Sequence, residues 1–441
     1  MDHKYNLSWN SIARPTIRKV CIAAFLLTTT TLSWASENMP TASPESVGMS
    51  SERLGRIDEY FQRFIDNDQV VGAVSLVARH GKVVHHSAVG LKYREENIPM
   101  TTDTIFALAS MTKPIVSTAL MMLFEEGRFR LDDPISDWIP EYADHQVLVS
   151  DGARQRRVSE SSGVTIRQVL THTSGLTLSP ANRGMTEEEL RWVTNDGEQF
   201  STLGERVARA ALIPAAFHPG EHWQYGASTD YVAVLVEKIS GQSIDQFLGE
   251  RIFEPLGMHD TFYNVPRNKV DRVAARYTPD EDMKAELQRE PAYAEPTTYF
   301  PGVSGLNSTS SDYIRFAQMI SNGGELNGVR LLGRMTVDLM ISNHTDDKSV
   351  YIRGPGYGFG LGFGVLLDPT QSLDTLSPGS YGWGGAFGTL YYADPVEDLI
   401  GLMFIQLRGH GPLNIRQRFT NVVSQSVIDT VANREPKVQA Y

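Results

Sequence analysis

The chain has 441 residues, of which 41% are hydrophobic and 21% are charged, so it can bury a large core and is not a disordered protein. Its 52 acidic and 40 basic residues give a formal charge of −12, which would repel a nucleic-acid backbone or an anionic membrane surface. No basic stripe offsets this charge, so we expect no nucleic-acid partner.

The first 35 residues have the pattern of an export signal. Basic residues precede an apolar run over 20–27, and Ser33 and Ala35 then provide small side chains at the −3 and −1 positions of a cleavage site. We expect cleavage after Ala35, a periplasmic or secreted mature protein, and no stable membrane insertion afterwards. The run is short for a bilayer span, so a retained anchor is the less favoured alternative. Cys21, the only cysteine, lies in this segment, so the mature protein would have no disulfide and no thiol nucleophile.

The next stretch predicts a helix, a hairpin and a second helix. Residues 50–65 carry apolar side chains at the spacing of an amphipathic helix. Two apolar runs, 70–78 and 83–89, are separated by a short turn and predict a pair of antiparallel strands. Residues 113–124 are then almost all apolar and end before Gly127, so we expect a helix that is buried on all sides.

Ser110 and Lys113 lie at the start of this second helix. Residues three apart share one helix face, so the lysine amine would lie beside the serine hydroxyl. A serine hydroxyl is a weak nucleophile until a base takes its proton, and an uncharged lysine can be that base when burial lowers its pKa. A helix N-terminus also favours developing negative charge. The pair therefore indicates acyl-transfer chemistry, although the spacing alone also fits a solvated pair on a helix surface.

The middle and the end of the chain differ in pattern. From residue 132 to about residue 291, helices and loops predominate, with a polar stretch at 150–163. Strand-like patterns follow at 357–367, 388–393 and 399–406, and a helical pattern follows at 416–432.

Strands near both ends of the chain predict one sheet built from the two termini. We therefore expect an α/β fold with an inserted all-α domain. The sheet domain would comprise residues 36–131 and 292–441, and the mainly helical insertion would comprise residues 132–291.

Two further stretches complete the candidate site. Tyr225 comes just before an apolar helix that runs through residues 235–239. Residues 381–390 place a glycine-rich turn at the head of a strand, where small residues let a substrate approach the backbone closely. The chain thus has three ordered elements, which are Ser-x-x-Lys at 110–113, Tyr-Gly-Ala at 225–227 and Trp-Gly-Gly at 383–385.

This order of motifs resembles the serine β-lactamase and penicillin-binding-protein superfamily, with class C β-lactamases and family VIII carboxylesterases as the nearest groups. The likeness extends over residues 44–431, and residues 170–176 and 302–306 are similar to two further loops of that superfamily. The resemblance implies an antiparallel sheet flanked by helices, of the β-lactamase and transpeptidase type.

The resemblance also implies roles for single residues. Ser110 would be acylated, and Lys113 and Tyr225 would share the proton taken from it and return it to the leaving group. The backbone N–H groups of Ser110 and Ala386 would form the oxyanion hole, and water would then release the acyl group. We expect no cofactor, and the chain has no His-Glu-x-x-His motif or clustered ligand set, so we expect no metal either.

Two departures from the β-lactamase pattern indicate the substrate. Ala227 replaces an asparagine that contacts the substrate amide, and Trp383 replaces a lysine that attracts the β-lactam carboxylate. With Gly384 and Gly385, Trp383 would form an aromatic wall that binds the substrate, which favours small neutral esters. We therefore predict a secreted serine hydrolase that forms an acyl-enzyme at Ser110, with a carboxylesterase as the preferred activity. A β-lactamase, D-amino-acid peptidase or amidase of the same fold is the alternative, and a binding protein without activity is the third possibility.

Each candidate residue also has an ordinary structural explanation. Tyr225 fits an aromatic residue at a helix start, and Trp383 fits a core residue of a strand. We expect His172 to be a hydrogen-bonded loop residue and not a catalytic base, since no Gly-x-Ser-x-Gly motif requires a histidine. The alternating glycines from Gly358 to Gly364 fit a sheet strand and not a phosphate-binding loop.

Overall fold

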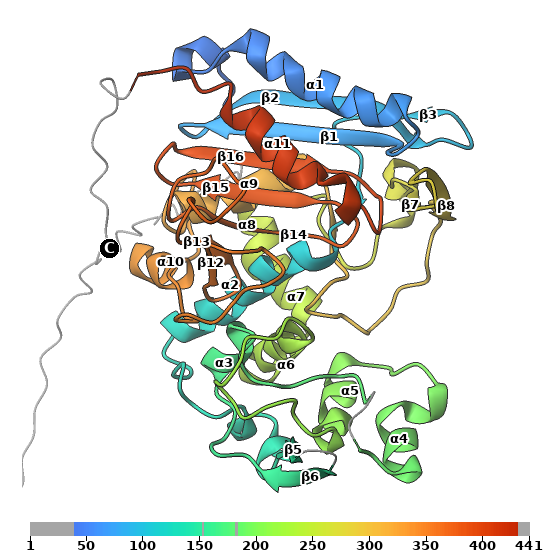
Figure 1. Cartoon of the computed structure of the whole chain (residues 1–441), viewed down its shortest axis with the longest axis vertical. Helices are drawn as coiled ribbons and strands as arrows, with labels where there is room; N and C mark the ends of the chain where they lie inside the picture. Colours follow the sequence, from blue (N-terminus) through green and yellow to red (C-terminus); the bar gives the residue numbers. More distant parts are fainter. Residues whose placement is uncertain (1–38, 152–153, 181–183, 431–441) are drawn as a thin grey trace, which may run out of the picture. The chain divides into compact units, whose positions relative to one another are not determined.

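An antiparallel sheet of eight strands lies at the centre of the fold (Figure 1). The computed structural model describes residues 39–151, 154–180 and 184–430. Within these residues the strand order is β12-β13-β14-β15-β16-β1-β2-β3, and each neighbouring pair is antiparallel. The expected antiparallel sheet flanked by helices is therefore confirmed.

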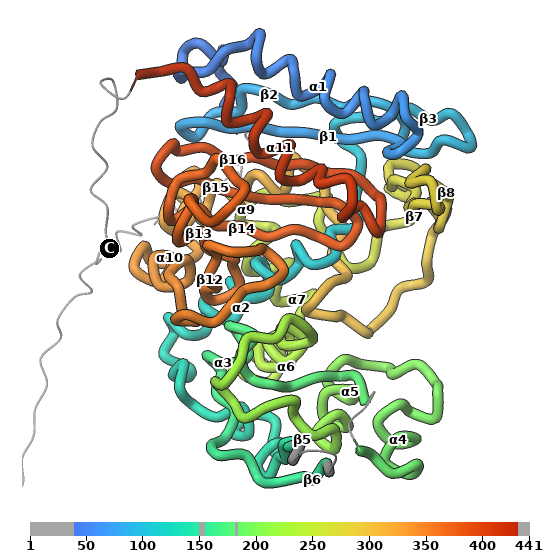
Figure 2. Tube along the Cα trace, in the orientation of Figure 1, coloured from blue at the N-terminus to red at the C-terminus, as the bar shows by residue number. Residues whose placement is uncertain are grey.

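The first and last parts of the chain build this sheet together. β1 (Gly72–Arg79) pairs with β2 (Lys82–Tyr93) on one side and with β16 (Leu399–Phe404) on the other. The tube view shows the blue N-terminal strands beside the red C-terminal strands (Figure 2). The remaining strands of the sheet are β3 (Ile98–Pro99), β12 (Tyr357–Phe359), β13 (Gly364–Leu366), β14 (Tyr381–Gly384) and β15 (Leu390–Asp394). One sheet made from both termini is what the strand pattern predicted.

Alternate residues of the central strands face two different layers of helices. Val77 of β1 belongs to a core that also contains residues of α1 (Ser51–Asp66) and α11 (Ile415–Ser424). Val74 of the same strand belongs to a second core, which contains residues of α9 (Ser310–Ser321). The split follows from the two-residue period of a strand, which sends successive side chains to opposite faces.

Two helices of the fold are buried and pack against each other. α2 (Thr112–Glu125) is buried along nearly its whole length, as its apolar sequence predicts, and it packs against α6 (Ser228–Ser240). A helix that is apolar on all sides is stable only when other elements cover it. The first turn of α2 is therefore held in a fixed position.

Residues 132–291 contain helices and two hairpins. The helices, apart from α6, are α3 (Ile166–Leu170), α4 (Glu187–Val193), α5 (Leu203–Arg209), α7 (Ile244–Leu248) and α8 (Glu254–Leu256). The hairpins are formed by β5 (Gln146–Asp151) with β6 (Arg154–Ser159) and by β7 (Arg276–Pro279) with β8 (Ala285–Arg289). Sequence analysis did not predict these strands, and the first hairpin overlaps the polar stretch at 150–163. The division into a sheet domain and an inserted domain stays a prediction.

One predicted strand is wrong in detail. Residues 357–367 form the hairpin of β12 and β13, with a turn between the two strands. Gly362 in this turn has a left-handed φ of 97°, and a side chain there would collide with the hydroxyl of Ser117. The alternating glycines therefore mark a turn as well as a strand.

The final helix is shorter than predicted. α11 ends at Ser424, because the residues that follow it pair with the backbone of residues 48–50. Residues 431–432 of the predicted helix, and the predicted signal at 1–35, lie outside the described residues. Among the residues that the structure describes, no helix is both long enough and apolar enough to cross a bilayer.

Candidate active site

Ser110 lies at the junction between a short strand, β4 (Phe106–Ala107), and helix α2. A 3₁₀ turn over Ala109–Met111 joins the two elements, and Ala109 has a φ of 46°, in the left-handed region that residues other than glycine rarely occupy. Such strain persists only where the surrounding structure enforces it, and it is frequent at functional sites. The turn is therefore a rigid support for Ser110.

Lys113 holds its amine next to the Ser110 hydroxyl. The Nζ–Oγ distance is 3.2 Å, as the three-residue spacing predicts. Nζ also donates to the Val303 carbonyl at 2.9 Å and lies 4.8 Å from the centre of the Tyr225 ring. Lys113 is only 2% exposed, whereas Ser110 is partly exposed. The serine is thus the member of the pair that a ligand can reach.

Tyr225 lies just before α6, as predicted, and within a cluster of aromatic rings. The Trp383 indole N–H donates to the Tyr225 hydroxyl oxygen at 3.0 Å, and the two ring centres are 5.4 Å apart. The rings of His172 and Trp223 lie 4.9 Å and 6.0 Å from the Tyr225 ring. Contacts on several sides leave the Tyr225 ring little freedom, so its hydroxyl is held in one place.

Trp383 is a core residue and a site residue at the same time. It is 2% exposed and packs edge-to-face against Phe359, with ring centres 5.2 Å apart. Its indole nitrogen nevertheless bonds to Tyr225, and part of the residue lines the cavity described below. The two explanations considered for this tryptophan therefore apply together.

A cavity of about 340 Å³ joins the predicted site residues. Its wall includes Ser110, Tyr225, Trp383, Gly384, Gly385 and Ala386. The buried amine of Lys113 reaches Ser110 from behind this wall. A volume of this size suits a small organic molecule.

Gly384 and Gly385 are required by the packing of the protein itself. A side chain at Gly385 would collide with the Leu108 carbonyl oxygen, and one at Gly384 would press against the Arg416 guanidinium. The Thr389 hydroxyl donates to the same Leu108 carbonyl at 3.1 Å. The glycines therefore let the end of β14 lie directly against the turn that carries the serine.

Ser110 and Ala386 both contribute to the cavity wall. Within the described residues, neither of their backbone N–H groups donates to another backbone group outside a helix or strand. Backbone N–H groups stabilise an oxyanion when they point at the position where its charge develops. The assignment of Ser110 and Ala386 to an oxyanion hole stays a prediction.

Arg353 and Arg416 also line the cavity, and sequence analysis missed both. Arg416, in the first turn of α11, donates to the Gly385 carbonyl, and burial together with the charge of Arg353 lowers its pKa to about 9. Arg353 donates to the Tyr357 hydroxyl at 2.9 Å and lies 4.0 Å from Asp374. In the described part of the chain, the Nε atom of each arginine is buried without a hydrogen-bond partner. No motif spacing relates these residues to the serine, so the sequence carried no signal for them.

Asp230 is a buried carboxylate beside the site that sequence analysis also missed. It is 3% exposed, lies in the first turn of α6, and accepts the Val303 N–H at 2.9 Å. Burial raises its pKa to about 6, while the Val303 hydrogen bond and the charge of Lys113 act in the opposite direction. An acidic residue inside an apolar helix is costly unless it is paired, and this was the available signal.

The ring of His172 packs among the aromatic rings of Trp223, Tyr225 and Phe359. Its carbonyl accepts the Gln224 N–H at 2.9 Å, while its Nδ1 has no partner among the described residues. Burial lowers the pKa of this histidine well below its ordinary value, so the ring is uncharged. The loop placement fits the prediction, but the hydrogen bond is made by the backbone. In the same described ranges, no three His, Cys, Asp or Glu side chains lie together as metal ligands.

The sheet, the Ser-x-x-Lys pair at the start of a buried helix and the cavity above the serine define a serine hydrolase of the β-lactamase fold. The family model for Beta-lactamase matches residues 57–421, and the chain belongs to this family.

Known relatives agree with this assignment. The chain is 33% identical over 347 residues to Protein Rv1367c of Mycobacterium tuberculosis, a match that covers 76% of this chain and 85% of that protein. It is 31% identical over 387 residues to Esterase EstB of Burkholderia gladioli, with 82% and 93% coverage. Among solved structures, EstCE1, a hydrolase with promiscuous acyltransferase activity, has a TM-score of 0.70 at 25% identity and covers 86% of this chain and 99% of its own. Simvastatin synthase LovD of Aspergillus terreus shares the fold, with a TM-score of 0.71 at 23% identity over 85% and 98% of the two chains.

Proposed function

We propose that this protein is an exported carboxylesterase that hydrolyses small neutral esters through an acyl-enzyme at Ser110. One observation carries the proposal, namely the series of contacts from the Ser110 hydroxyl to the Lys113 amine, the Tyr225 ring and the Trp383 indole. The similarity to Esterase EstB supports an ester as the substrate class. Trp383, in the place of a β-lactamase lysine, supports an uncharged group next to the indole.

In the first half of the reaction, Ser110 Oγ attacks the ester carbonyl carbon while its proton passes to the pair of Lys113 and Tyr225. Lys113 contacts the serine oxygen directly and is the first acceptor, and Tyr225, whose ring lies against the amine, shares the proton with it. The carbonyl oxygen becomes an oxyanion that the backbone N–H groups of Ser110 and Ala386 stabilise. The bond to the alcohol oxygen then breaks, and the departing alcohol takes the proton.

Water completes the cycle. A water oxygen attacks the acyl carbon while one of its protons passes to Lys113 and Tyr225. The second tetrahedral intermediate breaks the bond to Ser110 Oγ, which takes that proton back. The products are a carboxylic acid and the free serine, so no oxidant, reductant or cofactor is consumed.

A second candidate, an amide hydrolase such as a β-lactamase or a D-amino-acid peptidase, is favoured by a different observation. Arg353 and Arg416 line the cavity and have unpaired buried Nε atoms. A carboxylate on the substrate would form charge-assisted hydrogen bonds with such guanidinium groups. The two candidates therefore differ in the charge of the preferred substrate.

Covalent labelling tests the nucleophile. A fluorophosphonate should label Ser110, and Ser110→Ala should abolish the labelling. Ser174→Ala is the matched control, because Ser174 is a fully buried serine of a nearby loop and its removal should leave the labelling intact. Attachment to Ser174 or Ser304 in the wild type would show that the assignment is wrong. A folded protein that takes up no label would favour the third possibility, a binding protein.

A substrate panel tests the class. Short-chain aryl esters should be hydrolysed with a higher kcat/KM than cephalosporins or D-amino-acid peptides. The reverse order would favour the amide hydrolase.

Export is a separate part of the proposal and is supported by the pattern of residues 1–35. We expect the mature protein to begin near Ser36. The intact mass of the exported protein checks this position, and a mass that includes residues 1–35 would contradict cleavage.

A further inference from the structure

Asp230 connects the helix after Tyr225 to the lysine beside the serine. Its carboxylate accepts the Val303 N–H at 2.9 Å, and the carbonyl of the same Val303 accepts the Lys113 amine at 2.9 Å. A single residue therefore separates the buried carboxylate from the amine that contacts Ser110.

The loop around Val303 depends on this contact for its position. Gly302 lies so close to α6 that a side chain there would collide with the Thr229 carbonyl oxygen. Further along the loop, the Leu306 N–H donates to the hydroxyl of Thr112 at 3.3 Å. Thr112 is the residue that precedes Lys113 in α2. The loop thus bridges α6 and α2, and Asp230 is the side chain that holds its Val303 end.

The charge of Asp230 also acts on its surroundings. Lys113 and Arg206 are the cations that favour its ionised form. Tyr231, Tyr263 and Tyr299 face the same carboxylate, and burial raises the pKa of each, so these phenols are uncharged at neutral pH. The Asp230 carboxylate and the Lys113 amine therefore attract each other across Val303.

We infer that Asp230 is a positioning residue, which holds the Val303 carbonyl against Lys113 and whose negative charge sets the pH range over which Ser110 reacts. The inference rests on the proposed function, because it takes Lys113 as the base for Ser110. It assigns a role to a residue outside the three motifs, and the residue acts without touching the substrate.

Two variants separate the hydrogen bond from the charge. Asp230→Asn keeps an oxygen acceptor for Val303 and removes the charge. The acidic limb of the rate of Ser110 labelling by a fluorophosphonate should move to lower pH by about one unit, the size expected for the loss of a nearby buried charge. Asp230→Ala also removes the acceptor, so labelling should slow at least about tenfold at every pH, and the asparagine variant should recover most of that loss.

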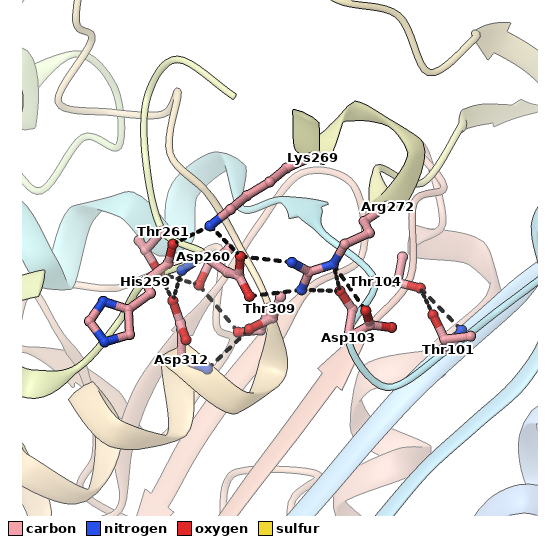
Figure 3. A network of polar contacts seen from close by, with 11 residues as sticks. Thr101, Asp103, Thr104, His259, Asp260, Thr261, Lys269, Arg272, Thr309 and Asp312 are labelled. Carbon is pink, nitrogen blue, oxygen red and sulfur yellow. Dashed lines mark hydrogen bonds and ion pairs between the residues drawn. The ribbon is translucent and has the colours of Figure 1, made fainter. Parts of the chain in front are cut away.

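Asp312→Asn is the matched control. Asp312 is also a buried aspartate in the first turn of a helix, but it belongs to a separate polar network (Figure 3). This variant should leave the acidic limb of the labelling profile in place.

The outcomes are distinct. A folded Asp230→Asn protein with the wild-type acidic limb, or an Asp230→Ala protein as reactive as the asparagine variant, would overturn the inference and leave the esterase proposal standing. Failure of both variants to fold would assign Asp230 to stability alone and would also overturn it. If Asp230→Ala alone fails to fold, the asparagine variant decides. An unlabelled wild type would reject the proposed function and the inference together.

Discussion

Asp230 and Asp312 are two buried aspartates in similar settings with different neighbours. They lie in the first turns of α6 and α9, and burial raises the pKa of each to about 6. Each accepts a backbone N–H from a loop, from Val303 at 2.9 Å in the first case and from Asp260 at 2.6 Å in the second. Desolvation therefore affects the two carboxyl groups in the same way.

The partners decide what each carboxylate does. Asp230 is linked to Lys113 by the backbone of Val303, which donates to the carboxylate and accepts from the amine. Asp312 instead accepts the Thr261 hydroxyl at 2.8 Å and lies beside the ion pair of Asp260 with Arg272 (Figure 3). None of the residues labelled in this network lines the described cavity. A raised pKa in this protein thus reports burial, and it indicates function only when the partner belongs to the site.

The largest effect is expected in the site to which Asp230 is linked, at the nucleophile Ser110. Ser110→Ala should lower kcat/KM by roughly 10⁴-fold or more, because the other members of a catalytic unit do little without the nucleophile. Its stability should change by less than about 0.5 kcal/mol, since a partly exposed hydroxyl is removed. Steady-state kinetics and urea unfolding measure the two quantities. A variant that keeps about a tenth of the activity would exclude Ser110 as the nucleophile.

The next effect tests whether the site acts as one unit. Lys113→Ala and Tyr225→Phe should each reduce turnover by about 10²–10⁴-fold, the range for loss of general acid–base catalysis. The double variant should be little worse than either single variant, because the two groups share one proton. Losses that add in a double-mutant cycle would instead show that the groups act independently.

Asp312, which lies outside the site, predicts an effect of pH on the free energy of unfolding. The pKa of Asp312 is raised from 3.8 to about 6 by burial, so the folded state binds its proton more tightly than the unfolded state. This contribution is present below about pH 4 and is lost as the pH rises through about 6, by up to about 3 kcal/mol. Asp312→Asn carries no titrating group, so its free energy of unfolding should improve relative to wild type over that interval. Urea unfolding at several pH values checks the sign, and a constant difference would contradict it.

The smallest predicted effect concerns specificity. Trp383→Lys should improve binding of carboxylate-bearing substrates by about tenfold to a hundredfold, since a hydrogen bond to a charged group contributes roughly 1.5–3 kcal/mol. It should also weaken activity on neutral esters, because the wall loses its apolar ring. The ratio of kcat/KM for a cephalosporin and a short-chain aryl ester measures the change. An unchanged ratio in a folded variant would leave Trp383 with a packing role only.

The parts of the site that could be predicted from the sequence are those set by local geometry or by an ordered motif. The contact of Ser110 with Lys113 follows from a three-residue spacing on one helix. Tyr225 and Trp383 were placed by resemblance, and their hydrogen bond joins residues from distant segments. Arg353 and Arg416 escaped notice because only the tertiary fold brings their segments to the cavity.

For the fold, too, only the features that local sequence patterns determine could be predicted. The hydrophobic periodicity predicted α1 and β1 closely, because each buries a continuous apolar face, whereas β2 is mostly half-buried and extends beyond the predicted residues 83–89. It failed at residues 357–367, where the chain turns at Gly362. Ser117 lies so close to this glycine that a side chain there would collide with it, a contact that no local pattern records. It also predicted a helix that continues beyond the observed end of α11 at Ser424. The residues after Ser424 form backbone hydrogen bonds with residues 48–50 and do not continue the helix.

The pairing of β1 with β16 has a consequence for the order of folding. Val74 and Phe404 are register partners although more than three hundred residues separate them in the chain. Contacts between such distant residues form slowly, because a long loop must close before they stabilise anything. During folding, β1 therefore keeps one open edge until the segment that forms β16 is available to pair with it. Any product that stops short of β16 exposes that apolar edge to other chains, where it favours aggregation.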